Sequence, residues 1–153
     1  MHMTISPPSA VLLTRADIEK LLPHRPPMLL LDEVLSRTED TLIARKKFLP
    51  DEFFFQGHYP HYPLVPGVIM CEAGMQAGAI LLHQFVDDAS KVPVATRLNE
   101  VKFKRMVTPN ETIEIEAKLN ERLADAFFLS VKITCEGKLC TRFDFGCTLA
   151  AAK

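Results

Sequence analysis

His58 and Glu72 are the two ionisable side chains best placed for acid–base chemistry. Both lie in residues 56–78, QGHYPHYPLVPGVIMCEAGMQAG. His58 lies between glycine and prolines, which limit the backbone and hold an imidazole in a fixed direction, and histidine is the usual proton shuttle near neutral pH. Glu72 lies in an apolar run, where an unpaired carboxylate costs several kcal/mol. We therefore expect Glu72 to have a partner, a cavity or a raised pKa.

Two further residues would complete an acid–base site. Gln76, one helical turn after Glu72, can hydrogen-bond the carboxyl group and fix its orientation. Gly67 begins the predicted helix, where free amides can hold a developing oxyanion. A base, an acid and an oxyanion site are the set needed to eliminate water from a β-hydroxy thioester. Two plainer interpretations stay open from these residues alone: His58 as a surface histidine, and Glu72 as a loop cap or part of an ordinary water pocket.

The hydrophobic pattern predicts the elements that must position these residues. Residues 67–86 have the pattern of a helix that is apolar on nearly every face and must therefore be enclosed. Apolar and polar residues alternate in 113–119, the period of a strand with one wet face. A short helix is expected at 16–24, and further strands at 28–37, 41–49, 92–107, 127–135 and 139–149. The predicted fold class is α+β, a curved antiparallel sheet of about six strands wrapped around one long central helix.

Size and charge exclude several classes of protein. The 153 residues fit a single domain, 1–153. Lysine plus arginine number 18 against 19 acidic residues, so the charge of −1 gives no field that would attract nucleic acid. The apolar run 73–86 is too short and too polar to cross a bilayer of about 30 Å. Residues 1–15 lack the pattern of a secretory signal, and we expect part of them to be flexible.

Cysteine and metal chemistry receive little support. The four cysteines lack zinc-ligand spacing, and we expect reduced, buried thiols in a cytoplasmic protein. His58 and His61 with Glu72 imitate part of a zinc set, but a catalytic zinc needs three converging ligands, so we expect no metal and no cofactor. Cys71 points about 100° away from Glu72 on a helix, which favours core packing over a role as nucleophile.

Basic residues could attract an acidic protein partner by electrostatic steering. The alternative, which the sequence favours, is that they form the solvated side of strands. The residues concerned are Arg45, Lys46, Lys47, Lys102, Lys104 and Arg105.

Three stretches carry a resemblance to a known family: LPHRPPMLLLDEV (22–34), FFQGHYPHYPLVPGVIMCEAGMQAG (54–78) and VKFKRMVTP (101–109). The chain resembles, from about residue 16 onward, the 3-hydroxyacyl-[acyl-carrier-protein] dehydratases of the FabZ type, which have the hot-dog fold. The middle stretch is specific, because it combines the GH(F/Y)P loop, the PGV helix start and the glutamate in fixed order. The related FabA-type enzymes, which also isomerise the double bond, carry aspartate at the position of Glu72, so the glutamate favours the FabZ type.

The resemblance implies a role for each candidate residue. His58 would be the catalytic base and Glu72 the acid, contributed by opposite subunits of a homodimer that can assemble further into a hexamer. Gln76 would orient the carboxyl group, and the Gly67 amide would polarise the thioester carbonyl. His24 and Arg25, in the LPHR match, are expected to have a structural role. The residues expected to line the substrate tunnel are Phe55, Tyr59, Val68 and Met106, the last in place of the family's usual proline.

The implied reaction converts (3R)-3-hydroxyacyl thioesters on acyl carrier protein to trans-2-enoyl thioesters in fatty acid or related lipid biosynthesis. The acyl carrier protein would be the partner. Two alternatives stay open: a hot-dog acyl thioesterase, and a non-catalytic acyl-binding member of the family. A thioesterase would release free thiol, whereas a dehydratase generates enoyl absorbance without thiol.

Overall fold

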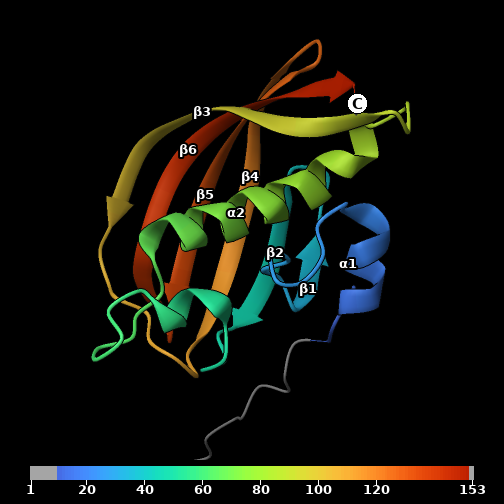
Figure 1. The fold of residues 1–153 in the computed structure, drawn as a ribbon. Coiled ribbons are helices and arrows are strands. Elements are labelled where there is room, and N and C mark those ends of the chain that lie inside the picture. Colours follow the sequence, from blue (N-terminus) through green and yellow to red (C-terminus); the bar gives the residue numbers. More distant parts are fainter. Residues whose placement is uncertain (1–9, 152–153) are drawn as a thin grey trace, which may run out of the picture.

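One long helix lies across the concave face of a curved sheet in the computed structural model, which describes residues 10–151 (Figure 1). The helix is α2 (Gly67–Leu82), and a short helix, α1 (Arg15–Leu21), lies beside the end of α2 near the first strands. The strand order is β1-β2-β4-β5-β6-β3, and every neighbouring pair is antiparallel. The strands are β1 (Glu33–Arg37), β2 (Thr41–Lys47), β3 (Lys91–Phe103), β4 (Thr112–Leu123), β5 (Ala126–Cys135) and β6 (Lys138–Ala151). This arrangement confirms the predicted α+β class.

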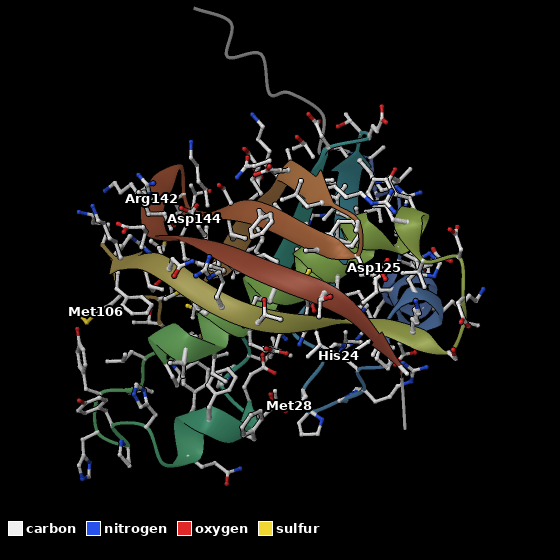
Figure 2. The ribbon with its side chains drawn as sticks, turned by 90° about the horizontal axis from the view of Figure 1, so that it is seen from above. His24, Met28, Met106, Asp125, Arg142 and Asp144 are labelled. Carbon is white, nitrogen blue, oxygen red and sulfur yellow. The ribbon has the colours of Figure 1, made fainter. Side chains whose placement is uncertain are left out.

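Strand β3 forms a long free edge of the sheet. It has thirteen residues and pairs with β6 on one side only (Figure 2). Its apolar side chains are unusually exposed: Val94 is 45%, Leu98 43% and Phe103 54% accessible. Because a long apolar edge strand is a template for pairing with another chain, β3 is the part of the sheet best suited to an interface.

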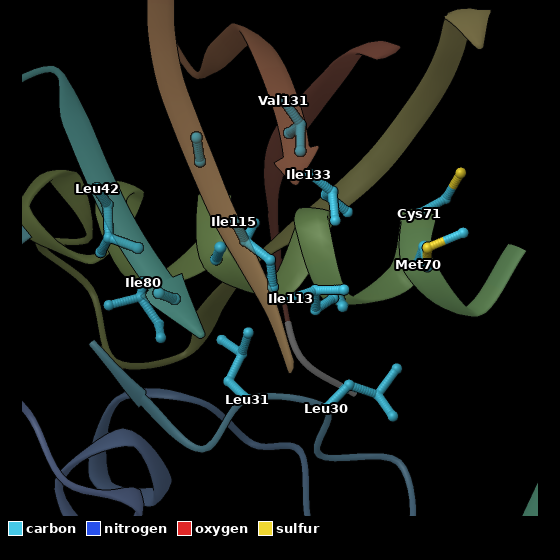
Figure 3. Close-up of a cluster of buried hydrophobic side chains, with 14 of the residues drawn as sticks. Leu30, Leu31, Leu42, Met70, Cys71, Ile80, Ile113, Ile115, Val131 and Ile133 are labelled. Carbon is cyan, nitrogen blue, oxygen red and sulfur yellow. The ribbon is translucent and has the colours of Figure 1, made fainter. Parts of the chain in front are cut away.

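Small residues let α2 approach the sheet closely. A Cβ atom at Gly74 would lie 2.7 Å from Cζ of Phe143, and one at Gly78 would lie 2.6 Å from Cζ of Phe145. Figure 3 shows larger side chains of the helix, including Met70 and Ile80, in the same apolar cluster as side chains of β4 and β5. Close packing of this kind fixes the rotation of the helix and hence the direction of its polar side chains.

All six predicted strands have different boundaries in the structure, and two of the differences are explained by a particular hydrogen-bond partner. The strand predicted at 28–37 begins only at Glu33, because the Gln76 amide bonds the backbone that precedes it: Nε2 donates to the Met28 carbonyl (2.7 Å) and Oε1 accepts from the Leu30 amide (2.9 Å). The strand predicted at 92–107 ends at Phe103, after which the amides of residues 104 and 105 both donate to the Cys140 carbonyl. Each boundary is therefore set by a partner distant in sequence.

The helix boundaries also differ slightly from the prediction. Helix α2 ends at Leu82 and continues as a 3₁₀ turn, η2 (His83–Phe85), so the last residues of the helix predicted at 67–86 lie beyond it. Helix α1 begins after Thr14, whose hydroxyl accepts from the Asp17 amide while the Asp17 carboxylate accepts from the Thr14 amide. This capping box fixes the start of α1.

The amino-terminal segment is described only in part. Residues 1–9 of the segment expected to be flexible lie outside the described residues. Leu13 pairs with Val34 at the start of the sheet, which ties the chain down before α1. No helix within residues 10–151 has both the length and the apolar character needed to span a bilayer.

Candidate active site

His58 is held with one ring nitrogen occupied and the other free to act. It follows a 3₁₀ turn, η1 (Phe53–Gln56), and its amide donates to the Phe54 carbonyl. Its Nδ1 lies 3.0 Å from the Leu64 carbonyl oxygen. A carbonyl can only accept, so Nδ1 carries the proton and Nε2 keeps its lone pair. The exposed ring of Tyr59 packs edge-on against the imidazole, with centroids 4.8 Å apart.

A cavity of about 650 Å³ lies between His58 and the start of α2. Gly67 is the first residue of the helix, so its amide has no acceptor within the helix and the positive end of the dipole lies there. A Cβ atom at Gly67 would lie 2.5 Å from the ring of Phe103, which also lines the cavity. The cavity therefore combines an imidazole, a free amide and a close approach that only glycine permits.

The predicted tunnel residues divide between this cavity and its surroundings. Val68 and Met106 line it, and both are largely exposed in a single chain. Phe55 is buried in the core, and Tyr59 lies beside His58 at the surface. Lining by Phe55 and Tyr59 stays a prediction.

An ion cluster holds the loop that supplies Arg105 and Met106 to the cavity. The Arg105 guanidinium donates to Glu111 Oε2 (2.9 Å), while the amide and hydroxyl of Thr108 donate to Glu111 Oε1 (2.9 and 2.8 Å). Burial disfavours the ionised form of Glu111, but the hydrogen bonds from Thr108, Arg105 and Cys135 outweigh it and hold the pKa at about 2. The loop is thus fastened by a charged carboxylate.

Glu72 lines a second, smaller cavity of about 260 Å³ between α2 and the start of β3. Gln76 Nε2 donates to Glu72 Oε1 (3.1 Å), while the rest of the buried amide is fixed by the backbone of Met28 and Leu30. The orienting role expected for Gln76 therefore has a structural basis. Phe145 and Val94 supply apolar walls.

Of the three alternatives expected for Glu72, the structure shows two, a partner and a cavity. His24 Nε2 lies 3.5 Å from Glu72 Oε1. This neighbour is the main reason that the pKa of Glu72 is lowered, and the Gln76 amide lowers it further against the opposing effect of burial. The contacts within one chain therefore favour the carboxylate, and the third alternative, a raised pKa, is not found.

Sequence reasoning gave His24 only a structural role and missed its contact with Glu72. The residue stands in the LPHR match, which was the available signal, but the two positions are separated by 48 residues in the chain. Arg25 has the structural role expected of it: its guanidinium donates to the carbonyls of Glu19, Leu22 and His24.

His58 and Glu72 face different cavities in a single chain, with no lining residue in common. The His58 cavity includes Phe103 at the end of β3, and the Glu72 cavity includes residues 93–95 near its start. Figure 2 shows Met106, from the first cavity, and His24, from the second, well separated along this strand. The structure of a single chain therefore does not bring His58 and Glu72 into one cavity.

The structure distinguishes buried from accessible residues among the remaining candidates, Cys71 and the basic side chains. Burial raises the pKa of the Cys71 thiol, in accord with a packing role. Lys46 is not on a solvated face: it is buried, with Nζ 2.7 Å from Glu52 and 3.8 Å from Asp32, so it is unavailable to a protein partner. Lys104 and Arg105 line the His58 cavity. No cluster of three or more metal-ligating side chains was found within the described part of the chain.

Comparison with solved structures defines the fold class. The dehydratase heterocomplex ApeI:P from Xenorhabdus doucetiae aligns with a TM-score of 0.73 at 16% identity, covering 87% of this chain and 90% of that chain. A hypothetical thioesterase with coenzyme A from Streptococcus pneumoniae TIGR4 aligns with a TM-score of 0.62 at 10% identity, covering 79% and 87%. These likenesses show the hot-dog fold, in which a sheet wraps around one helix.

Sequence comparison defines the family. Residues 22–144 match the FabA-like domain. The chain is 38% identical over 123 residues to the 3-hydroxyacyl-[acyl-carrier-protein] dehydratase FabZ of Clostridium perfringens, covering 80% of this chain and 88% of the relative. It is 42% identical over 110 residues to FabZ of Oenococcus oeni, covering 71% and 79%. The chain belongs to the FabA-like family and, within it, to the FabZ-type dehydratases.

Proposed function

We propose that this protein is a 3-hydroxyacyl-[acyl-carrier-protein] dehydratase that forms trans-2-enoyl thioesters in fatty acid biosynthesis. The observation that carries the proposal is the free Nε2 of His58 in a cavity that also holds the Gly67 amide. The names of the FabZ relatives supply the substrate class and the carrier. The chemistry uses only groups of the protein itself.

The reaction follows from the positions of these groups. The thioester carbonyl accepts a hydrogen bond from the Gly67 amide, which stabilises negative charge on oxygen and acidifies C2. His58 Nε2 removes the C2 proton. Glu72, whose contacts favour the carboxylate, must take up a proton before this step, and it donates that proton to the C3 hydroxyl, which leaves as water. The C2–H and C3–O bonds break while the C2–C3 double bond forms. The cycle closes when His58 loses its proton and Glu72 regains one.

A second copy of the chain would bring the two side chains together. The two cavities lie near opposite ends of edge strand β3, so antiparallel pairing of two β3 strands about an axis near Leu98 would place Phe103 of one copy beside Val94 of the other. The His58 cavity of one chain would then adjoin the Glu72 cavity of its partner. The exposed apolar side chains of β3 support this pairing.

The carrier and the location follow from the same proposal. Lys104 and Arg105 stand at the His58 cavity, where positive charge would favour approach of an acidic carrier protein. The four cysteines are free thiols, which supports a cytoplasmic location. Assembly of the proposed dimer into a hexamer stays a prediction.

Two substitutions test the roles of the site residues. Assayed with a 3-hydroxyacyl thioester on acyl carrier protein, His58→Ala and Glu72→Gln are each expected to lose about 10²- to 10⁴-fold in kcat, the range of one general acid–base step. His61→Ala, an exposed histidine of the same loop, is the matched control and should retain activity. Full activity in either site variant would refute its assigned role.

The same assay separates dehydration from thioester hydrolysis. Dehydration raises enoyl absorbance and leaves the amount of free thiol unchanged. Release of thiol at the rate of substrate loss, without enoyl product, would instead establish a thioesterase.

A further inference from the structure

We propose that His24 is a positioning residue for Glu72, and that it holds the carboxyl group as a neutral hydrogen-bond donor through Nε2. In His58 the ring proton is on the other nitrogen, Nδ1. This inference rests on the proposed function, because it assigns a third side chain to the same acid–base site. His24 contacts the Glu72 carboxyl group, so the proposed effect passes through Glu72.

The contacts of the Glu72 carboxyl group support this role. Oε1 lies 3.1 Å from the Gln76 amide nitrogen and 3.5 Å from His24 Nε2, so two groups from different parts of the chain converge on one oxygen. The second distance is long for a hydrogen bond, and such contacts in free enzymes tighten when substrate binds. Together the two groups fix the direction of the Glu72 carboxyl group. With the Gln76 contact alone, the Glu72 side chain could still rotate.

The tautomer follows from the other ring nitrogen. His24 Nδ1 is buried and has no hydrogen-bond partner among residues 10–151. A buried N–H without an acceptor costs more than a buried lone pair without a donor. The proton is therefore on Nε2, where it can be donated to the carboxylate. His58 has the opposite arrangement, with the Nδ1 proton on the Leu64 carbonyl and Nε2 free to accept.

The backbone of His24 is suited to positioning. The Arg25 guanidinium donates to the carbonyls of His24 (2.7 Å), Leu22 (2.8 Å) and Glu19 (2.9 Å), which fastens the loop to the end of α1. A ring on such an anchored loop holds its partner at lower entropic cost than a ring on a mobile loop would.

Within residues 10–151 of one chain, His24 is the only basic side chain among the residues that line the Glu72 cavity. The cavity lies between the loop after α1, α2, β3 and β6. Among the lining residues in the described part of one chain, the one further titratable side chain is the Cys147 thiol. Burial raises the pKa of Cys147 to about 11, so it is neutral at the pH of the reaction. Within one chain the pKa of Glu72 therefore depends most on the side chain at position 24, and the His58 cavity that the proposed dimer adds is the same in every variant at that position.

Nitrogen NMR of the wild-type protein tests the tautomer directly. In the full chain with ¹⁵N-labelled histidine above pH 8, the His24 ring is expected to carry its proton on Nε2 and the His58 ring on Nδ1. Finding the His24 proton on Nδ1 would overturn the proposal, because Nε2 could then donate nothing to the carboxylate. This measurement needs no variant and no substrate.

Two substitutions test the consequence for Glu72. His24→Gln keeps a neutral donor of similar reach, whereas His24→Leu removes the donor. Carbon NMR of labelled glutamate is expected to show the Glu72 titration midpoint at higher pH in His24→Leu and close to wild type in His24→Gln. An unchanged midpoint in His24→Leu would refute the role.

Turnover provides the second readout of these variants. His24→Leu should lose about 10- to 100-fold in kcat with little change in KM, the effect of a misplaced acid, and His24→Gln should recover most of the loss. Equal losses in both variants would contradict a donor role. The titration measures the carboxyl group whether or not the protein dehydrates a thioester, so failure of the proposed reaction and failure of this inference give different results.

Discussion

The Glu111 carboxylate gives the most quantitative prediction. It accepts hydrogen bonds from the amide and hydroxyl of Thr108 and from the guanidinium of Arg105. These bonds, which outweigh the effect of burial, lower its pKa from 4.5 to about 2. At 1.36 kcal/mol per pH unit that difference corresponds to about 3 kcal/mol of folding stability. Because the side chains of Glu111 and Arg105 are 22% and 27% exposed, screening by water reduces the expected value to about 2 kcal/mol.

The perturbation is Glu111→Gln, which removes the charge at nearly constant shape. A carboxyl group whose pKa is lower in the folded state stabilises the fold above its unfolded pKa, and the contribution is lost as the pH falls through the folded pKa. The variant is therefore expected to be about 2 kcal/mol less stable than wild type at pH 7. The difference should shrink as the pH falls from 4.5 towards 2.

Urea denaturation followed by circular dichroism at pH 7, 5 and 3 measures this difference, at one fixed chain concentration because the proposed dimer couples stability to concentration. Glu121→Gln, an exposed glutamate on β4 with no resolved interaction of its carboxylate, is the control and should differ from wild type by less than about 0.5 kcal/mol. A Glu111→Gln variant as stable as wild type at pH 7, or a deficit that stays constant down to pH 3, would refute the reasoning.

Two further substitutions test packing and the buried ion cluster by denaturation at pH 7. Gly74→Ala should destabilise the fold by about 1 to 2 kcal/mol, because the new Cβ atom would lie 2.7 Å from the ring of Phe143. The control Gly57→Ala should be neutral, because a Cβ atom there would meet no atom within 4 Å. Equal effects of the two substitutions would contradict the close-packing argument. Lys46→Met should cost about 3 kcal/mol, because it leaves the Glu52 carboxylate without its buried cation, and adding Glu52→Gln should recover part of the loss. No recovery in the double variant would show that the ion pair is not the cause.

The sequence predicted those parts of the fold that depend on local pattern. Alternation in β4 placed Ile113, Ile115 and Ala117 on the buried face, where the structure has them. The same two-residue period in β2, with Leu42 and Ala44 buried, places Lys46 inside, and that signal was available but not used. Local periodicity therefore explains the class, the strand count and the central helix.

Contacts between distant residues explain what sequence reasoning missed. The late start of β1 depends on the Gln76 amide, which replaces a neighbouring strand as hydrogen-bond partner of Met28 and Leu30. The lowered pKa of Glu72 depends on His24, a residue on a different element. Neither contact produces a hydrophobic periodicity in the sequence. The ionisation of Glu72, the candidate acid, could therefore not be predicted from the apolar residues around it.

The separation of His58 and Glu72 into two cavities makes pairing of chains the central claim. The most direct test mixes His58→Ala chains with Glu72→Gln chains, carrying different tags, refolds them together and measures dehydratase activity. Half of the dimers are then mixed, and each mixed dimer has one complete site of two, so about one quarter of wild-type activity is expected from two nearly inactive proteins. Activity no greater than that of the two variants measured separately, in mixed dimers isolated through both tags, would contradict a site built from two chains.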